Sequence, residues 1–148
     1  MRNLITGGAG FIGSHLAEHL LAQGEEVIVW DNLSTGRMQN LRRCFGRPGF
    51  QYIIGDFTED AHFERVVSRV DVVYHLAAAV GVQLIVNDPV RTIETNIVGS
   101  EVALRCAAKF GRRIFLASTS EVYGKGVKVP FSEDDDVLYG PTTKRRWN

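Results

Sequence analysis

Short unbroken apolar runs alternate along this chain with longer segments whose apolar residues recur at helical spacing. Runs of the first kind are typical of strands that are covered on both faces. The predicted strands are 4–6, 27–30, 51–54, the part of 71–79 before the turn that ends it, and 113–118. The predicted helices are 11–24, 60–69 and 90–109. A parallel sheet needs crossovers of this kind, so the order predicts an α/β fold.

The expected architecture is a doubly wound parallel sheet (Rossmann fold) in three layers, with its two halves meeting beside the first strand. Each helix should bury one stripe. The residues expected to face inward are Ile12, Leu16, Leu20, Leu21, Phe63, Val66, Val67, Ile93, Ile97, Ala103, Leu104 and Ala107. We expect the sheet to be incomplete at the fifth-strand edge, where Ile114, Phe115 and Leu116 would leave an uncovered apolar strip. Segment 37–49 is expected to be irregular, with at most a short helix.

The first apolar run leads into residues 7–13, here called the glycine turn. Its glycines, Gly7, Gly8, Gly10 and Gly13, fit both G-x-G-x-x-G and G-x-x-G-x-x-G. In a dinucleotide-binding turn such glycines let the backbone turn tightly, approach a pyrophosphate and pack against the sheet, while the amides of the following helix meet the phosphates. The spacing alone is weak evidence, because an ordinary glycine-rich turn has the same pattern.

Asp31 ends the second apolar run, 18 residues after Gly13. An acidic residue at this distance accepts hydrogen bonds from ribose hydroxyls, and its charge repels the additional phosphate of NADP. We therefore predict NAD as the cofactor. A solvated aspartate at a strand end is the alternative. Arg37 stands close enough in sequence to meet a 2′-phosphate, which leaves the NADP reading open.

Bulk composition excludes some partners and locations. Seventeen basic and 17 acidic residues leave no net charge and hence no basic field, which argues against nucleic acid. No apolar run reaches the roughly 18 residues of a membrane span, and we predict no signal peptide, because Met1-Arg2 leads straight into the expected first strand. We expect a cytoplasmic protein with no membrane partner.

Neither the cysteines nor the histidines predict a metal site. Cys44 and Cys106 lack metal-type spacing; Cys106 is expected in the core of a helix and Cys44 in a loop. His15 and His19 stand four residues apart, but without an accompanying acidic motif they are expected on a helix surface.

Candidate ligand contacts follow the strand ends, because ligands of open parallel sheets bind at the carboxyl edge. Polar residues after the second strand would line the adenosine ribose or phosphate, or else form a solvated turn; they are Asn32, Ser34, Thr35 and Gly36. Asp56 and Phe57 would lie beside the adenine. The small residues after the fourth strand would leave room for the nicotinamide ribose. Asn96, in the long helix, is expected to bond a loop carbonyl or to be exposed, and we favour the former.

The motifs stand in one order along the chain: Thr6–Leu16, Asp31–Leu33, Gly55–Asp56, His75–Ala78 and Ser118–Gly124. Together they resemble the extended short-chain dehydrogenase/reductase family, in its UDP-glucose 4-epimerase-like branch of nucleotide-sugar epimerases and dehydratases. The resemblance covers essentially all 148 residues. It implies permanently held NAD, a nucleotide-sugar substrate such as a UDP-hexose, and transient oxidation of a sugar hydroxyl with return of the hydride. For the full-length parent it implies a homodimer.

Residue by residue, the resemblance implies contacts with pyrophosphate, ribose, adenine and the nicotinamide path. The implied cofactor-binding residues are Gly7, Gly10, Phe11, Ile12, Gly13, Asp31, Asn32, Ser34, Thr35, Gly36, Asp56, Phe57, Leu76, Ala77, Ala78, Asn96 and Ser118. The implied catalytic residues are Thr119, Ser120 and Glu121. Thr119 matches the hydroxyl that bonds the reacting sugar oxygen, and Ser120-Glu121 is similar to the pair in UDP-glucuronate decarboxylases and sugar dehydratases.

The chain departs from the family pattern at the catalytic base. The family uses Tyr-x-x-x-Lys, in which the Lys lowers the pKa of the Tyr. No tyrosine here has a lysine four residues later, and after Tyr139 the nearest one, Lys144, is one residue too far. Residues 140–147 look like the run before the catalytic helix. We therefore expect residues 1–148 to be the NAD-binding domain, the N-terminal part of a longer enzyme without its substrate domain, and inactive alone. The alternatives are a non-catalytic NAD-binding module and a UDP-glucuronate decarboxylase-like enzyme.

Overall fold

A computed structural model describes residues 1–59, 61–79, 87–126, 128–137 and 139. It divides into two compact units, Met1–Leu116 and Ala117–Asn148, and each is described by itself. The predicted sequence run 140–147 lies outside the described residues. Among those residues, no helix combines the length and the apolar character that crossing a membrane requires.

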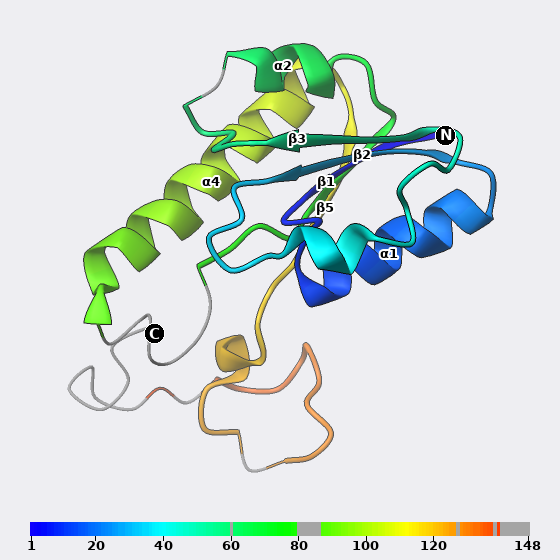
Figure 1. Cartoon of the computed structure of the whole chain (residues 1–148). Coiled ribbons are helices and arrows are strands. Elements are labelled where there is room, and N and C mark those ends of the chain that lie inside the picture. The colour runs from blue at the N-terminus through cyan, green and yellow to red at the C-terminus, as the bar shows by residue number, and fades with distance from the viewer. Residues whose placement is uncertain (60, 80–86, 127, 138, 140–148) are drawn as a thin grey trace. The chain divides into compact units, whose positions relative to one another are not determined.

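The first unit is built on a parallel five-stranded sheet (Figure 1). Its strands are β1 (Arg2–Thr6), β2 (Glu26–Asp31), β3 (Phe50–Ile54), β4 (Val72–His75) and β5 (Arg113–Leu116). The spatial order is β3-β2-β1-β4-β5, and Ile5 lies opposite Val29 on one side and Tyr74 on the other. Because the order reverses at β1, the predicted doubly wound sheet is confirmed, and the carboxyl ends of all five strands meet at one edge.

Helices cover both faces of the sheet, which makes three layers (Figure 1). The helices are α1 (Phe11–Ala22), the 3₁₀ turn η1 (Met38–Leu41), α2 (His62–Val67) and α4 (Pro89–Lys109). Successive strand residues face opposite ways, so Leu4 packs in one apolar cluster with α2 and α4, while Ile5 packs in the other with α1 and η1. The segment between β2 and β3 holds only η1, as the sequence predicts.

The structure corrects the predicted stripes of the two long helices. Ile12 of α1 is 68% exposed, and Ile93, Ile97 and Leu104 of α4 are exposed as well. The inward faces instead carry mainly small residues: Gly13, Ser14, Ala17, Leu20 and Leu21 in α1, and Thr92, Gly99, Ala103, Cys106 and Ala107 in α4. Small side chains let a helix backbone approach its neighbours closely, which turns the larger apolar residues of α4 outward.

The edge strand β5 is shorter than predicted and only partly uncovered. It ends at Leu116 rather than at residue 118. Phe115 and Leu116 are exposed, as expected, but Ile114 packs against the cluster beneath α4. The exposed apolar strip therefore consists of Phe115 and Leu116. The expectation that Ile114 is also uncovered is wrong.

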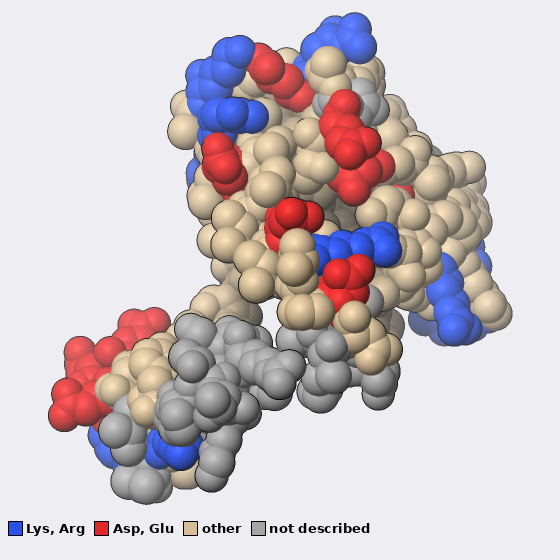
Figure 2. Space-filling model, turned by 90° about the vertical axis from the view of Figure 1, so that its left-hand side faces the viewer, with Lys and Arg blue, Asp and Glu red and all other residues tan. Residues whose placement is uncertain are grey.

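Charged side chains of opposite sign lie next to one another on the face shown in Figure 2. Ion pairs join Arg2 to Glu26 at 2.6 Å and Lys109 to Glu64. Cys106 is buried in α4 as predicted, and Cys44 lies in the irregular segment but is fully buried. His15 and His19 are exposed on α1, in agreement with the sequence.

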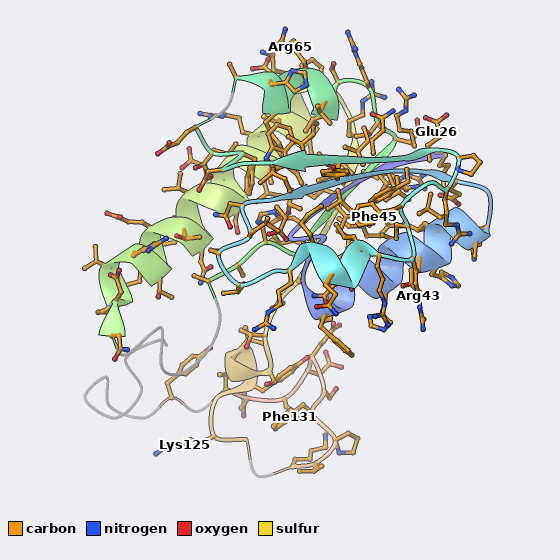
Figure 3. All side chains as sticks on the ribbon, viewed as in Figure 1. Glu26, Arg43, Phe45, Arg65, Lys125 and Phe131 are labelled. Carbon is orange, nitrogen blue, oxygen red and sulfur yellow. The ribbon has the colours of Figure 1, made fainter. Side chains whose placement is uncertain are left out.

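The second unit has its own aromatic contact. Its 3₁₀ turn η2 spans Ser120–Tyr123, and the Tyr123 ring stacks on Phe131 (Figure 3) with centroids 5.0 Å apart. Lys128 Nζ pairs with Asp135 Oδ1 at 2.7 Å. These contacts order the polar segment that follows η2.

Candidate cofactor-binding site

The glycine turn is packed so closely that side chains are excluded at several positions. Gly7 has φ +69°, and a Cβ there would lie 2.7 Å from the Ala77 nitrogen. A Cβ at Gly13 would lie 2.5 Å from the Gly7 carbonyl oxygen. Contacts this short with backbone atoms admit only glycine, so the turn, the first turn of α1 and the chain after β4 meet backbone to backbone.

The start of α1 is open to an anion. Gly10 is its N-cap residue, no side chain caps the helix, and no acidic residue stands in its first turn. The first amides of a helix have no acceptor within the helix, and the helix dipole adds positive potential there. Phe11 and Ile12 belong to this turn, with side chains that point to solvent. A cradle of glycines beside free amides fits the pyrophosphate of a dinucleotide.

Asp31 holds the glycine turn from the end of β2. Its Oδ2 accepts the Ala9 amide at 2.9 Å and its Oδ1 accepts the Leu33 amide at 2.7 Å, with the residue only 8% exposed. The alternative of a solvated aspartate is therefore wrong. A carboxylate can accept about four hydrogen bonds, so acceptor capacity remains for ribose hydroxyls. Gly36 lies against this carboxylate, since a Cβ there would be 2.9 Å from Oδ1.

The loop after β2 brings the other predicted adenosine contacts to the same edge. Ser34 donates its amide to Asn32 Oδ1 at 3.0 Å, which forms a local turn, and Thr35 is exposed. Arg37 is exposed too, with its backbone amide bonded to the Ala9 carbonyl at 3.0 Å. Both ligand-lining and turn-forming roles remain compatible with this loop.

Asp56 and Phe57 follow β3 but have different surroundings. Burial raises the pKa of Asp56, but hydrogen bonds from Thr58 and Asn32 and the charge of Arg91 lower it more, so the pKa lies below its ordinary value. Asp56 is thus held as a carboxylate that can accept an amine. The Phe57 side chain is buried, with its ring 4.7 Å from the Phe63 ring, and belongs to the core. The expected contact of this ring with adenine stays a prediction.

Two polar contacts fix the chain after β4. The Ala77 amide donates to Thr6 Oγ1 at 3.3 Å, and this hydroxyl lies 2.8 Å from His75 Nδ1, to which it can donate its proton. The Asn96 amide group pairs with both the nitrogen and the oxygen of Ala79, at 2.7 and 3.2 Å. The predicted bond from Asn96 to a loop carbonyl is present. Leu76 and Ala77 are half-buried and Ala78 is exposed on this segment.

The buried His75 predicts a dependence of stability on pH. Burial lowers the pKa of His75 below its ordinary value of 6.5. Between those two values the unfolded chain binds a proton that the folded chain does not, so we expect the free energy of unfolding to fall as pH decreases through about 6.5 and below, by at most about 1.4 kcal/mol per pH unit. Urea unfolding at several pH values measures this pH dependence of the free energy of unfolding.

His75→Asn and His19→Gln separate this effect from other titrations. Asparagine retains an acceptor for Thr6 but cannot titrate, so the variant should lose most of the dependence between about pH 5.5 and 7. His19 is exposed on α1, and its variant should keep the wild-type slope. An unchanged slope in His75→Asn would contradict the assignment.

The predicted catalytic residues lie in the second unit. Ser118, Thr119 and Ser120 are exposed and line an open cleft together with Glu133 and Asp135. The backbone of Glu121 lies in η2, and its side chain is outside the described residues. The Tyr139 hydroxyl donates to the Val122 carbonyl at 3.0 Å. Val122, Tyr123 and Val137 complete the lining, so the cleft combines hydroxyls and carboxylates with apolar surface, as ligand pockets generally do.

Sequence reasoning missed Thr6, His75 and Asn40 as contributors to the site. Thr6 looks like a strand residue, and Asn40 lies in a segment without any chemical pattern. Only the order of the strands brings Thr6 beside His75, and no local signal marks the bond from Asn40 to the glycine turn.

Across the described portion of the chain, no group of three or more His, Cys, Asp or Glu residues could hold a metal ion.

A family profile described as GDP-mannose 4,6 dehydratase matches residues 4–142. The chain belongs to this family. The predicted resemblance to nucleotide-sugar epimerases and dehydratases is thereby confirmed. The GDP-mannose 4,6-dehydratase family assignment rests on the sequence over almost the whole chain, and the glycine turn, Asp31 and the parallel sheet all fall within the matched part.

Individual relatives agree with the family assignment. The chain is 45% identical to UDP-N-acetyl-alpha-D-glucosaminuronate decarboxylase of Bacillus cytotoxicus, over 99% of this chain and 45% of that protein. It is 46% identical to UDP-glucuronic acid decarboxylase 6 of Arabidopsis thaliana, over 99% of this chain and 38% of that protein. The crystal structure of a dTDP-glucose 4,6-dehydratase double mutant from Streptomyces venezuelae, with NAD bound, matches with a TM-score of 0.86 and 34% identity, over 94% of this chain and 46% of that one. The chain thus spans less than half the length of these relatives.

Proposed function

We propose that this chain binds NAD at the carboxyl edge of its sheet and forms the cofactor half of an enzyme that modifies a nucleotide sugar, with a UDP-hexose as the substrate class. One observation carries the proposal. The uncapped start of α1 lies beside a glycine turn in which backbone contacts exclude a side chain at Gly7 and Gly13, with Asp31 held next to it at the end of β2. The NAD-bound dehydratase relative supports the same cofactor.

Each part of the edge has a role in this proposal. The glycine turn and the first amides of α1 would hold the pyrophosphate, Asp31 and Asn32 the adenosine ribose, and Asp56 the adenine amine. Bound NAD would accept a hydride from a sugar carbon and return it within one turnover. Thr119 would bond the reacting sugar hydroxyl and orient it. A Tyr-x-x-x-Lys pair is absent from the sequence, so the base that takes the proton must come from elsewhere, and we expect no turnover by these 148 residues alone.

A narrower candidate is decarboxylation of a UDP-linked uronic acid. It is supported by the identity of 45–46% with two decarboxylases. The pair Ser120-Glu121 agrees with it, because it is similar to the pair in UDP-glucuronate decarboxylases. The third reading, a non-catalytic NAD-binding module, needs no base and predicts binding without any partner segment.

Calorimetric titration with NAD and with NADP tests the central claim. We expect saturable binding of NAD and weaker binding of NADP, because the Asp31 carboxylate would repel the 2′-phosphate. Failure of the folded chain to bind either dinucleotide would overturn the proposed function. Equal affinity for both would overturn the NAD preference and would point to Arg37 as a partner of the additional phosphate.

We further propose that the full-length parent of this chain is a homodimer and is located in the cytoplasm without membrane contact. The support for the dimer is the exposed stripe of α4, in which Val90, Ile93, Ile97 and Leu104 recur at helical spacing and are 42–63% exposed. Single exposed apolar residues are ordinary, but a stripe of four along one helix is typical of a contact surface.

Introducing a charge into this stripe should prevent the self-association. We expect the full-length parent to sediment as a dimer and its Ile97→Glu variant as a monomer, because a carboxylate buried in the contact has no partner there. Analytical ultracentrifugation measures both. Thr95→Glu, exposed on another side of α4, should remain dimeric. A monomeric wild type would contradict the dimer.

A further inference from the structure

Ala9 lies at the centre of the glycine turn with both sides of its backbone held. Its side chain is fully buried, and its amide donates to Asp31 Oδ2 at 2.9 Å. Its carbonyl oxygen accepts two hydrogen bonds, one from Asn40 Nδ2 at 2.7 Å and one from the Arg37 amide at 3.0 Å. The position of the Ala9 carbonyl is therefore set by the loop between β2 and β3.

That loop is itself anchored in the core. Leu41, the last residue of η1, is fully buried in the cluster beneath α1, and Met38 packs against the same cluster. The backbone amide of Asn40 donates to the Arg37 carbonyl at 2.9 Å, which fixes the backbone from which the Asn40 side chain extends. The residue Asn40 is exposed, yet its side-chain nitrogen Nδ2 is directed to the Ala9 carbonyl of the glycine turn.

Glycines make this turn possible but do not hold it in one conformation. A glycine loses more conformational freedom on ordering than any other residue, and a site that is ordered before its ligand arrives binds more tightly. Within the turn, the Gly10 amide donates to the Gly7 carbonyl at 3.1 Å. The Ser14 amide donates to the Gly10 carbonyl at 3.1 Å, and three further hydrogen bonds restrain the segment at Ala9.

We propose that Asn40 is a positioning residue of the NAD site: by holding the Ala9 carbonyl, it keeps Gly10 and the first amides of α1 arranged to receive a pyrophosphate. The inference rests on the proposed function. Asn40 acts through Ala9, because its effect on the site requires only the bond from its Nδ2 to the Ala9 carbonyl.

Asn40→Ala and Asn40→Asp both remove the side-chain N–H that donates to the Ala9 carbonyl. Asn40→Asp also preserves the size of the side chain. We expect each to weaken the binding of NAD and of ADP by about three- to tenfold, and to leave the affinity for adenosine unchanged. A general loss of structure would weaken all three ligands alike. Gln39→Ala is the matched control, since Gln39 is exposed in the same turn, and it should bind all three as the wild type does.

Amide hydrogen exchange without ligand tests the contact itself. In both Asn40 variants the amides of Ala9 and Arg37 should exchange faster than in the wild type and in Gln39→Ala. Failure of the wild type to bind NAD and ADP would overturn the proposed function. Normal binding and unchanged exchange in the Asn40 variants, with wild-type binding intact, would overturn the positioning role alone.

Discussion

Replacing Gly7 with alanine is expected to abolish saturable NAD binding and to lower the free energy of unfolding by about 3 kcal/mol or more. Gly7 has φ +69°, and an added Cβ would lie 2.7 Å from the nitrogen and 2.8 Å from the Cα of Ala77. These are backbone atoms, so relief requires the chain after β4 to move away from the turn. Calorimetric titration measures the binding, and urea unfolding measures the stability.

Gly24→Ala serves as a control that separates the effect of the close contact with Ala77 from the effect of a positive φ. Gly24 also has a positive φ, +79°, but a Cβ there would meet nothing within 4 Å. The free energy of unfolding of this variant should fall only by the cost of a left-handed backbone at alanine, about 1 to 2 kcal/mol. The variant should bind NAD normally. Equal destabilisation of the two variants would show that the close approach at Gly7 does not matter.

Replacing Asp31 with alanine is the second large effect that we expect. The Ala9 and Leu33 amides would lose their acceptor, and an unsatisfied buried donor costs about 1 to 3 kcal/mol. The free energy of unfolding should therefore fall by about 2 to 4 kcal/mol. NAD affinity should fall by about 10- to 100-fold, because the ribose loses its acceptor and the glycine turn loses its support.

Glu26→Gln serves as the control for Asp31 because it changes a carboxylate at the opposite end of the same strand (Figure 3). Glu26 forms an exposed ion pair with Arg2, and such pairs contribute about 0 to 1 kcal/mol. NAD affinity should be unchanged. If Asp31→Ala retained wild-type affinity, the carboxylate would have no part in binding the ribose.

The sequence predicted the features of this fold that depend on neighbouring residues. Apolar runs placed all five strands, and glycine spacing placed the turn and the start of α1, because both patterns reflect local backbone requirements. The position of Asp31 followed from its distance to Gly13. Its burial did not, since that depends on the loop that closes over it from residues 33–37.

The errors have a common physical cause. Ile12, Ile93, Ile97 and Leu104 were expected inward because large apolar residues define a helical stripe, whereas close packing selected the small residues on another side of each helix. The bonds from Thr6 to His75 and from Asn40 to Ala9 join positions 69 and 31 residues apart. Neither pairing leaves a periodic trace in the sequence.

The double use of Asp31 constrains how the cofactor preference of such a site can change. The carboxylate that would exclude a 2′-phosphate is also the acceptor for two backbone amides of the turn and loop. A substitution that admits the phosphate therefore removes part of the scaffold that holds the pyrophosphate. An evolutionary or engineered route to the other dinucleotide must first supply new acceptors for Ala9 and Leu33, so selectivity and stability at this position cannot be altered independently.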